Sequence, residues 1–290
     1  MAQRYEIRPD WIARMRQLEG FKIVVIADDS GSMASIVAAS SATAANPYAP
    51  QRSRWDELKE GMNVIVDLAT CLDPEGVDIY FLNRPPVSKV TQHAQVEHLF
   101  HQPPGGFTPL SRTLRAVFGN TQQALAEGKK LLIIIATDGQ PTDDSGNVQI
   151  NEFFSLLANK PRGVFVQIMA CTDDEGAVQY LNAADENIPL LDVSNDFHSE
   201  RREILRAQGA GFHFTYGDYI AKCMLGPIDP CACKRCSRPP SSPLPLHKHA
   251  FSPHRVRAPL PQTLTTWTLF SAGATAAAAA AAPLCSQSFR

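Results

Sequence analysis

The segment FKIVVIADDSGSM, residues 21–33, joins an apolar run to a cluster of carboxylates and hydroxyls. Its apolar part lacks alternation of apolar and polar residues, which is typical of a strand buried on both faces of a parallel sheet. The polar part carries Asp28, Asp29, Ser30 and Ser32 directly after that strand. Because parallel strands all end at one edge of a sheet, the segment predicts a polar site at the carboxyl edge of an α/β domain.

Four further apolar runs rich in Ile and Val continue this pattern along the chain. They are VDIYFL (77–82), KLLIIIAT (130–137), VFVQIMAC (164–171) and IPLLDV (188–193). Apolar residues at spacings of three and four predict helices between them. These helices are expected from Trp55 to Ala69, from Leu110 to Phe118, and over 151–159, 175–183 and 198–208. The alternation predicts a doubly wound α/β fold, with a mainly parallel sheet and helices on both faces.

Composition bounds the class of protein. The chain has 290 residues, and a hydrophobic content of 44% is enough for a sizeable core. The N-terminal residues resemble no secretory signal, and the apolar run at 131–136 is too short to cross a bilayer, so a cytoplasmic protein without membrane contact is expected. The seven cysteines show no disulfide spacing, which favours reduced thiols.

Two segments depart from the strand and helix pattern. Residues 34–54 are rich in Ala, Ser and Pro, and predict a mobile insertion in a domain that spans 1–230. Residues 231–290 carry eight prolines, seven basic residues and no acidic residue, which predicts a disordered basic tail or translation through an intron or a shifted frame. CACKRC in that tail has zinc-ligand residue types without a paired C-x2-C frame, so zinc is not favoured. The acidic body offers no general basic patch for specific nucleic-acid binding.

Oxygen-bearing side chains follow three predicted elements. Asp28, Ser30 and Ser32 follow the first strand with the spacing D-x-S-x-S, Thr108 precedes a helix in PPGGFTPL, and Asp138 ends the strand 130–137. Two carboxylates and three hydroxyls form a hard donor set of low charge, which suits Mg²⁺ better than Zn²⁺. Ca²⁺ usually requires more oxygens, and Mn²⁺ remains an alternative. The sequence therefore predicts a divalent-cation site.

IADDSGSM, GGFTPL and ATDGQPTDD, in this order, resemble the three parts of the metal-ion-dependent adhesion site of von Willebrand factor type A domains. The similarity covers roughly residues 5–229, and stretches such as RWDELKE and VDIYFLNR resemble intracellular fungal, algal and protist proteins with one such domain. The resemblance implies that Ser30, Ser32 and Thr108 touch the metal, while Asp28 and Asp138 act directly or through water. It also implies that a glutamate or aspartate of a partner protein completes the coordination.

Each motif also has a plainer interpretation. Asp28, Ser30 and Ser32 are good helix caps, and Thr108 before Pro109 is a good helix N-cap. Asp29 is expected to be solvated or to support the ligands rather than to bind metal. Gly105 and Gly106 suit either a turn or a close approach to the ion. Asp173 and Asp174 are expected to stabilise a helix N-terminus, with a second cation site as the less favoured alternative.

Three classes of function follow from these observations. The favoured hypothesis is a Mg²⁺-dependent protein-interaction module that binds a partner carboxylate, and not an enzyme. A Mg²⁺-dependent phosphatase or hydrolase is the second, although phosphatases of the haloacid dehalogenase type need an aspartate where Ser30 stands, and no G-x-S-x-G elbow is present. A structural subunit with a vestigial metal site is the third.

Overall fold

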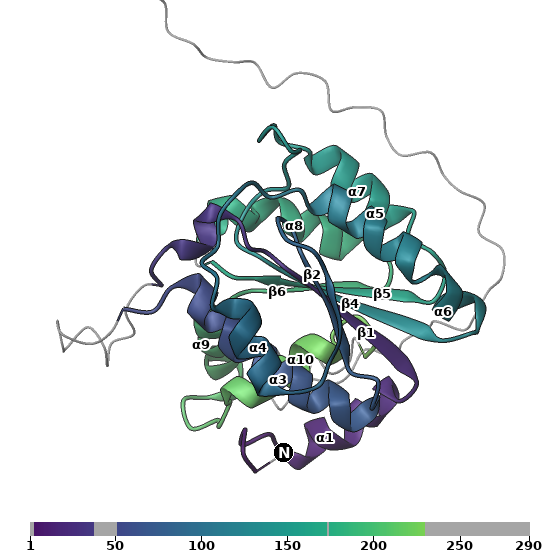
Figure 1. The fold of residues 1–290 in the computed structure, drawn as a ribbon. Coiled ribbons are helices and arrows are strands. Elements are labelled where there is room, and N and C mark those ends of the chain that lie inside the picture. Colours follow the sequence, from purple (N-terminus) through teal and green to yellow (C-terminus); the bar gives the residue numbers. More distant parts are fainter. Residues whose placement is uncertain (1–2, 38–50, 173, 230–290) are drawn as a thin grey trace, which may run out of the picture. The chain divides into compact units, whose positions relative to one another are not determined.

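The apolar run 21–27 forms strand β1, Phe21–Ala27, in the middle of a sheet (Figure 1). The computed structural model describes residues 3–37, 51–172 and 174–229, and in this part of the chain the sheet has six strands in the order β3-β2-β1-β4-β5-β6. The other strands are β2 (Val77–Phe81), β3 (Val87–Val90), β4 (Lys130–Thr137), β5 (Val164–Ala170) and β6 (Leu191–Ser194). All pairs are parallel except β2 with β3. The predicted doubly wound, mainly parallel fold is thus confirmed.

Helices cover both faces of this sheet (Figure 1). One face carries α5 (Leu110–Asn120), α6 (Gln122–Ala126), α7 (Ile150–Ala158) and α8 (Glu175–Asn187). The other carries α1 (Pro9–Met15), α3 (Arg54–Leu72), α4 (His93–Phe100), α9 (Phe197–Gln208) and α10 (Tyr216–Leu225). Short 3-10 helices, η1 (Arg16–Leu18) and η2 (Gly31–Ala34), flank β1. In the described ranges, no helix is long and apolar enough to cross a membrane.

Strand β1 explains why the sheet needs helices on both sides. Its residues Ile23 and Val25 pack in the core beneath α3, whereas Val24 and Ile26 pack in the core beneath α5. All four side chains are almost completely buried. Successive side chains of a strand point to opposite faces, so an uninterrupted apolar run is the sequence that such a position requires.

The strand order places a topological switch point between β1 and β4. From β1 the chain first runs to β2 on one side, and later returns to β4 on the other side. In open α/β sheets, ligands bind at the carboxyl ends of the strands beside such a point. Asp28 follows β1 and Asp138 follows β4, so both predicted carboxylates lie there.

Several elements differ from the sequence-based predictions. The strand expected at 188–193 begins only at Leu191, because Ile188 caps α8 and Leu190 takes a turn conformation with a φ of 57°. The sequence patterns also missed β3, α1, α4, α6 and α10. The expected insertion 34–54 has ordered ends, since Ile36 and Ser53 form a β-bridge. Residues 38–50 and the expected tail 231–290 lie outside the described residues.

Candidate functional site

Asp28 is held entirely within the protein. Its backbone N–H donates to the carbonyl of Ala136 at 3.0 Å, which extends the pairing of β1 with β4 by one residue. Its two carboxylate oxygens accept from the Ser30 N–H at 2.9 Å and from the Thr137 hydroxyl at 2.6 Å. Burial raises the pKa of Asp28 from 3.8 to about 6, although these hydrogen bonds oppose the change, and the nearby Asp138 charge raises it further. Asp28 therefore anchors the loop that carries the serines.

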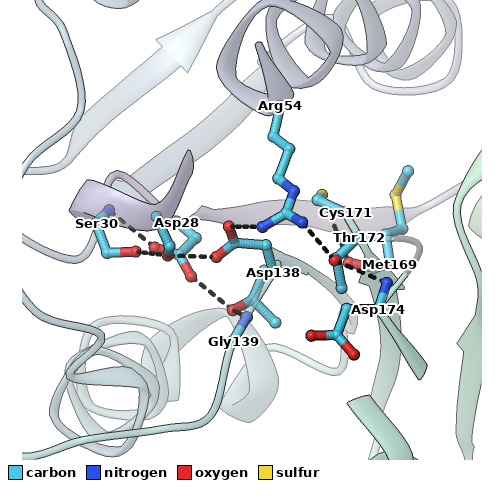
Figure 2. Close-up of polar contacts among 11 residues, drawn as sticks. Asp28, Ser30, Arg54, Asp138, Gly139, Met169, Cys171, Thr172 and Asp174 are labelled. Atoms are coloured by element: carbon cyan, nitrogen blue, oxygen red, sulfur yellow. Dashed lines mark hydrogen bonds and ion pairs between the residues drawn. The ribbon is translucent and has the colours of Figure 1, made fainter. Parts of the chain in front are cut away.

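The serines connect Asp28 to Asp138, and Figure 2 shows Asp28, Ser30 and Asp138 of this group. The hydroxyl oxygens of Ser30 and Ser32 lie 3.1 Å apart, and Ser32 donates to Asp138 Oδ1 at 2.7 Å. The side chain of Asp138 is completely buried. Four of the five predicted ligands thus form one hydrogen-bonded cluster, at the point where β1 and β4 end.

Arg54 adds a cation that the sequence patterns did not assign to the site. Its guanidinium donates to Asp138 Oδ2 at 2.8 Å and to the Thr172 hydroxyl at 2.7 Å (Figure 2). Arg54 is the first residue of α3, and a capping box between Ser53 and Asp56 fixes that start. The S-x-x-D pattern of this box was the available sequence signal for where the helix begins, but it does not indicate where the arginine points.

Thr108 lies beside the cluster without joining its hydrogen bonds. The loop before it is tied to the serine loop, because the Gly31 N–H donates to the carbonyl of Gly106 at 3.1 Å. The backbone N–H of Thr108 donates to the Thr142 hydroxyl at 3.0 Å. The interpretation of Thr108 as a helix N-cap is wrong: Pro109 occupies the cap position of α5, and no side chain caps this end.

Asp29 supports the neighbouring loop instead of facing solvent. It is 1% exposed, and its Oδ1 accepts from the backbone N–H groups of Leu82 and Asn83 at 2.9 and 2.8 Å. Its Oδ2 accepts from Arg84 Nε at 2.8 Å. The expectation that Asp29 is solvated is therefore wrong, and its side chain contacts Leu82, Asn83 and Arg84 instead of a predicted metal ligand.

The two glycines before Thr108, Gly105 and Gly106, differ in whether a side chain would fit at their position. Gly106 has a φ of 104°, and a Cβ there would lie 2.5 Å from Asn83 Oδ1. A Cβ on Gly105 would meet nothing within 4 Å. Gly106 is therefore needed for a close backbone approach to Asn83, which itself binds Asp29.

The remaining predicted groups have structural roles or lie outside the described residues. Asp174 caps α8 by accepting from the Gly176 N–H at 2.9 Å, as expected of a residue at a helix N-terminus. Asp173 and the cysteine-rich CACKRC are outside the described part of the chain. Within that part, no three side chains of His, Cys, Asp or Glu come together in a metal-binding group.

The donor set at the switch point nevertheless fits a hard divalent cation. It consists of two carboxylates and two hydroxyls, all of which offer oxygen atoms. Burial raises the pKa of the nearby Cys171 thiol, the charges of Asp138 and Asp28 raise it further, and the charge of Arg54 lowers it. Oxygen ligands are what Mg²⁺ prefers.

Comparison with known proteins gives limited further information. No protein-family model matches the chain, and no curated protein matches it. Among solved structures, manganese-loaded TRAP protein from Plasmodium vivax is 13% identical with a TM-score of 0.40, covering 62% of this chain and 69% of that chain. The pilus adhesin SpaC from Lactobacillus rhamnosus GG is 15% identical with a TM-score of 0.38, covering 61% of this chain and 28% of that chain. This chain thus spans little more than a quarter of SpaC, and neither match supports an inference about function.

Proposed function

We propose that this chain is a divalent-cation-dependent protein-interaction module of the von Willebrand factor type A kind. The observation that carries the proposal is the cluster in which Ser32 joins Ser30 to the buried carboxylate of Asp138, beside Asp28. Buried carboxylates require a cation or hydrogen-bond donors, and this pair lies where α/β folds bind ligands. Mg²⁺ is the proposed ion, with Mn²⁺ and Ca²⁺ as alternatives.

The residues of the site would have different roles in metal binding. Ser30, Ser32 and Thr108 would supply hydroxyl oxygens to the ion, and Asp28 and Asp138 would bind it directly or through water. When bound, the ion supplies an electrophilic position that an aspartate or glutamate of a partner protein can occupy. The protein's own contribution is rigidity, because Asp28 fixes the serine loop through the N–H of Ser30.

Metal titration tests the site assignment. Isothermal titration with Mg²⁺ and Mn²⁺ should show saturable binding that Asp138→Ala abolishes, because this change removes a charged oxygen ligand. Asp144→Ala is a matched control, since Asp144 lies in the loop after β4 but is exposed and pairs with Arg112 at the surface. Absence of binding in the wild type, or retained binding in Asp138→Ala, contradicts the site.

Recovery of partner proteins tests the interaction. The immobilised protein should retain partners from a native lysate in Mg²⁺, and should release them in EDTA. Asp138→Ala should recover none of the EDTA-sensitive partners, whereas Asp144→Ala should recover all of them. Partners that bind equally in Mg²⁺ and EDTA would show that the metal is not part of the interaction.

A catalytic role has no specific observation in its favour. Cys171 lies near the two carboxylates, but its raised pKa keeps it a thiol, and the thiolate is the nucleophilic form. Among the described residues, no histidine side chain is hydrogen-bonded to Asp28, Ser30, Ser32 or Asp138. The histidine that most often serves as the general base beside a serine nucleophile is therefore not part of this cluster in the described residues.

A further inference from the structure

A guanidinium already holds the oxygen of Asp138 that the serine loop leaves free. Ser32 takes Oδ1, and Arg54 takes Oδ2 at 2.8 Å. The Asp138 side chain is 0% exposed and that of Arg54 is 17% exposed, so water screens this ion pair only weakly. The second arm of the guanidinium donates to Thr172, which fixes its orientation.

The chain is built so that Arg54 arrives at this position. The Arg54 N–H donates to the carbonyl of Ser35 at 2.9 Å, and the Val37 N–H donates to the carbonyl of Arg52 at 2.9 Å. These bonds join the start of α3 to the segment that follows the serine ligands. The backbone of Arg54 is therefore held beside the site, while its long side chain has rotatable bonds that allow the guanidinium to leave.

A guanidinium and a metal ion cannot both bind the Asp138 carboxylate without weakening each other's binding. Like charges a few ångströms apart in a weakly screened site repel by several kcal/mol on the order-of-magnitude scale of Coulomb's law. A divalent ion on Asp138 thus weakens the hold of Arg54, and Arg54 weakens the attraction of Asp138 for the ion. Binding of one disfavours binding of the other.

We propose that Arg54 is the internal counterion of the metal site, which a divalent cation must displace from Asp138 Oδ2 in order to bind. This inference rests on the proposed function and adds the regulation of the same site. Arg54 keeps the buried carboxylate paired in the metal-free protein, and it sets the concentration at which the metal binds. The displaced guanidinium stays at the edge of the site, where an acidic partner residue arrives.

The test compares Arg54→Ala with Arg52→Ala in metal titrations. Arg52 is a matched control, because it lies two residues away, is exposed, and pairs with Glu60 instead of Asp138. Arg54→Ala should bind Mg²⁺ and Mn²⁺ at least about tenfold more tightly than the wild type does, since the metal no longer has to break a charge-assisted hydrogen bond. Arg52→Ala should bind like the wild type.

Arg54→Lys provides a variant of intermediate effect between the wild type and Arg54→Ala. Lysine keeps the charge but lacks the planar fork that spans Asp138 and Thr172, so its metal affinity should lie between those of wild type and Arg54→Ala. Thermal unfolding gives a readout that is independent of titration. In EDTA, Arg54→Ala should melt below the wild type because Asp138 loses its cation, and Mg²⁺ should raise its melting temperature by more than that of the wild type.

Each outcome decides between the two proposals. A folded Arg54→Ala variant that binds metal equally or more weakly than the wild type overturns the role of Arg54. If Asp138→Ala still abolishes binding in that case, the metal site itself stands. Metal binding by Arg54→Ala but not by the wild type supports the inference in its strongest form, and binding by neither overturns both proposals.

Discussion

Replacing Asp28 with asparagine should change how the stability of the metal-free protein depends on pH. The carboxyl is fully buried, and its pKa rises from 3.8 to about 6 on folding. Between these values the native state binds the proton more strongly than the unfolded chain does. The stabilising effect of the protonated carboxyl is present below the unfolded-state pKa of 3.8, and it is lost as the pH rises from there through about 6.

The size of the effect follows from the two pKa values. A difference of about two pKa units corresponds to about 3 kcal/mol, since each unit is worth about 1.4 kcal/mol. Asparagine is close in shape to the protonated acid and does not ionise. The difference in unfolding free energy, variant minus wild type, should therefore rise by roughly 2–3 kcal/mol between pH 4 and pH 7 in the absence of metal.

Urea denaturation in EDTA at pH 4, 5, 6 and 7 measures this difference. Titration of the groups that do not interact with Asp28 is common to both proteins and cancels in the subtraction. Addition of Mg²⁺ at pH 7 should stabilise the wild type and leave the variant unchanged, because the ion compensates the buried charge. If the difference between variant and wild type stays constant across the pH range, the reasoning about the buried carboxyl is refuted.

Two further substitutions test the loops around the site. Asp29→Ala should lower the free energy of unfolding by about 3 kcal/mol in urea denaturation, since it leaves a partly buried guanidinium and two backbone N–H groups without their acceptor. The exposed Asp144→Ala should cost less than about 1 kcal/mol, and equal costs would contradict the buried role. Gly106→Ala should destabilise by more than about 1 kcal/mol and weaken Mg²⁺ binding, because its Cβ would lie 2.5 Å from Asn83. Gly105→Ala meets nothing within 4 Å and should leave both measurements unchanged.

The central part of the fold was predictable from the sequence because its strands are buried on both faces. β1 and β4 have the predicted limits, 21–27 and 130–137, since apolar runs of Ile and Val have few alternatives to such a position. β3 was missed because it is a short edge strand, VSKV, in which only Val90 is buried. It lacks the continuous apolar run that marked the inner strands.

The candidate site was predictable to the extent that it follows from where strands end. Ser30 and Ser32 meet Asp138 because β1 and β4 are neighbours, and the sequence predicted only that these side chains share the edge where parallel strands end. Arg54 was not predictable, because it reaches Asp138 across 84 positions of the chain through a side-chain contact. No periodicity or spacing encodes the direction in which a long side chain points.

The neighbouring residues Asp28 and Asp29 hold the backbone at the end of β1 rigidly. The two neighbours bond in opposite directions, Asp28 toward β4 through Thr137 and Asp29 toward the end of β2. The backbone at the end of β1 is thereby fixed on both sides. The ion pair of Asp138 with Arg54, in contrast, is held by the tip of a flexible side chain that is 17% exposed. Under the proposed displacement, a cation would replace the guanidinium through rotation of one side chain, while the oxygen-bearing side chains keep their positions.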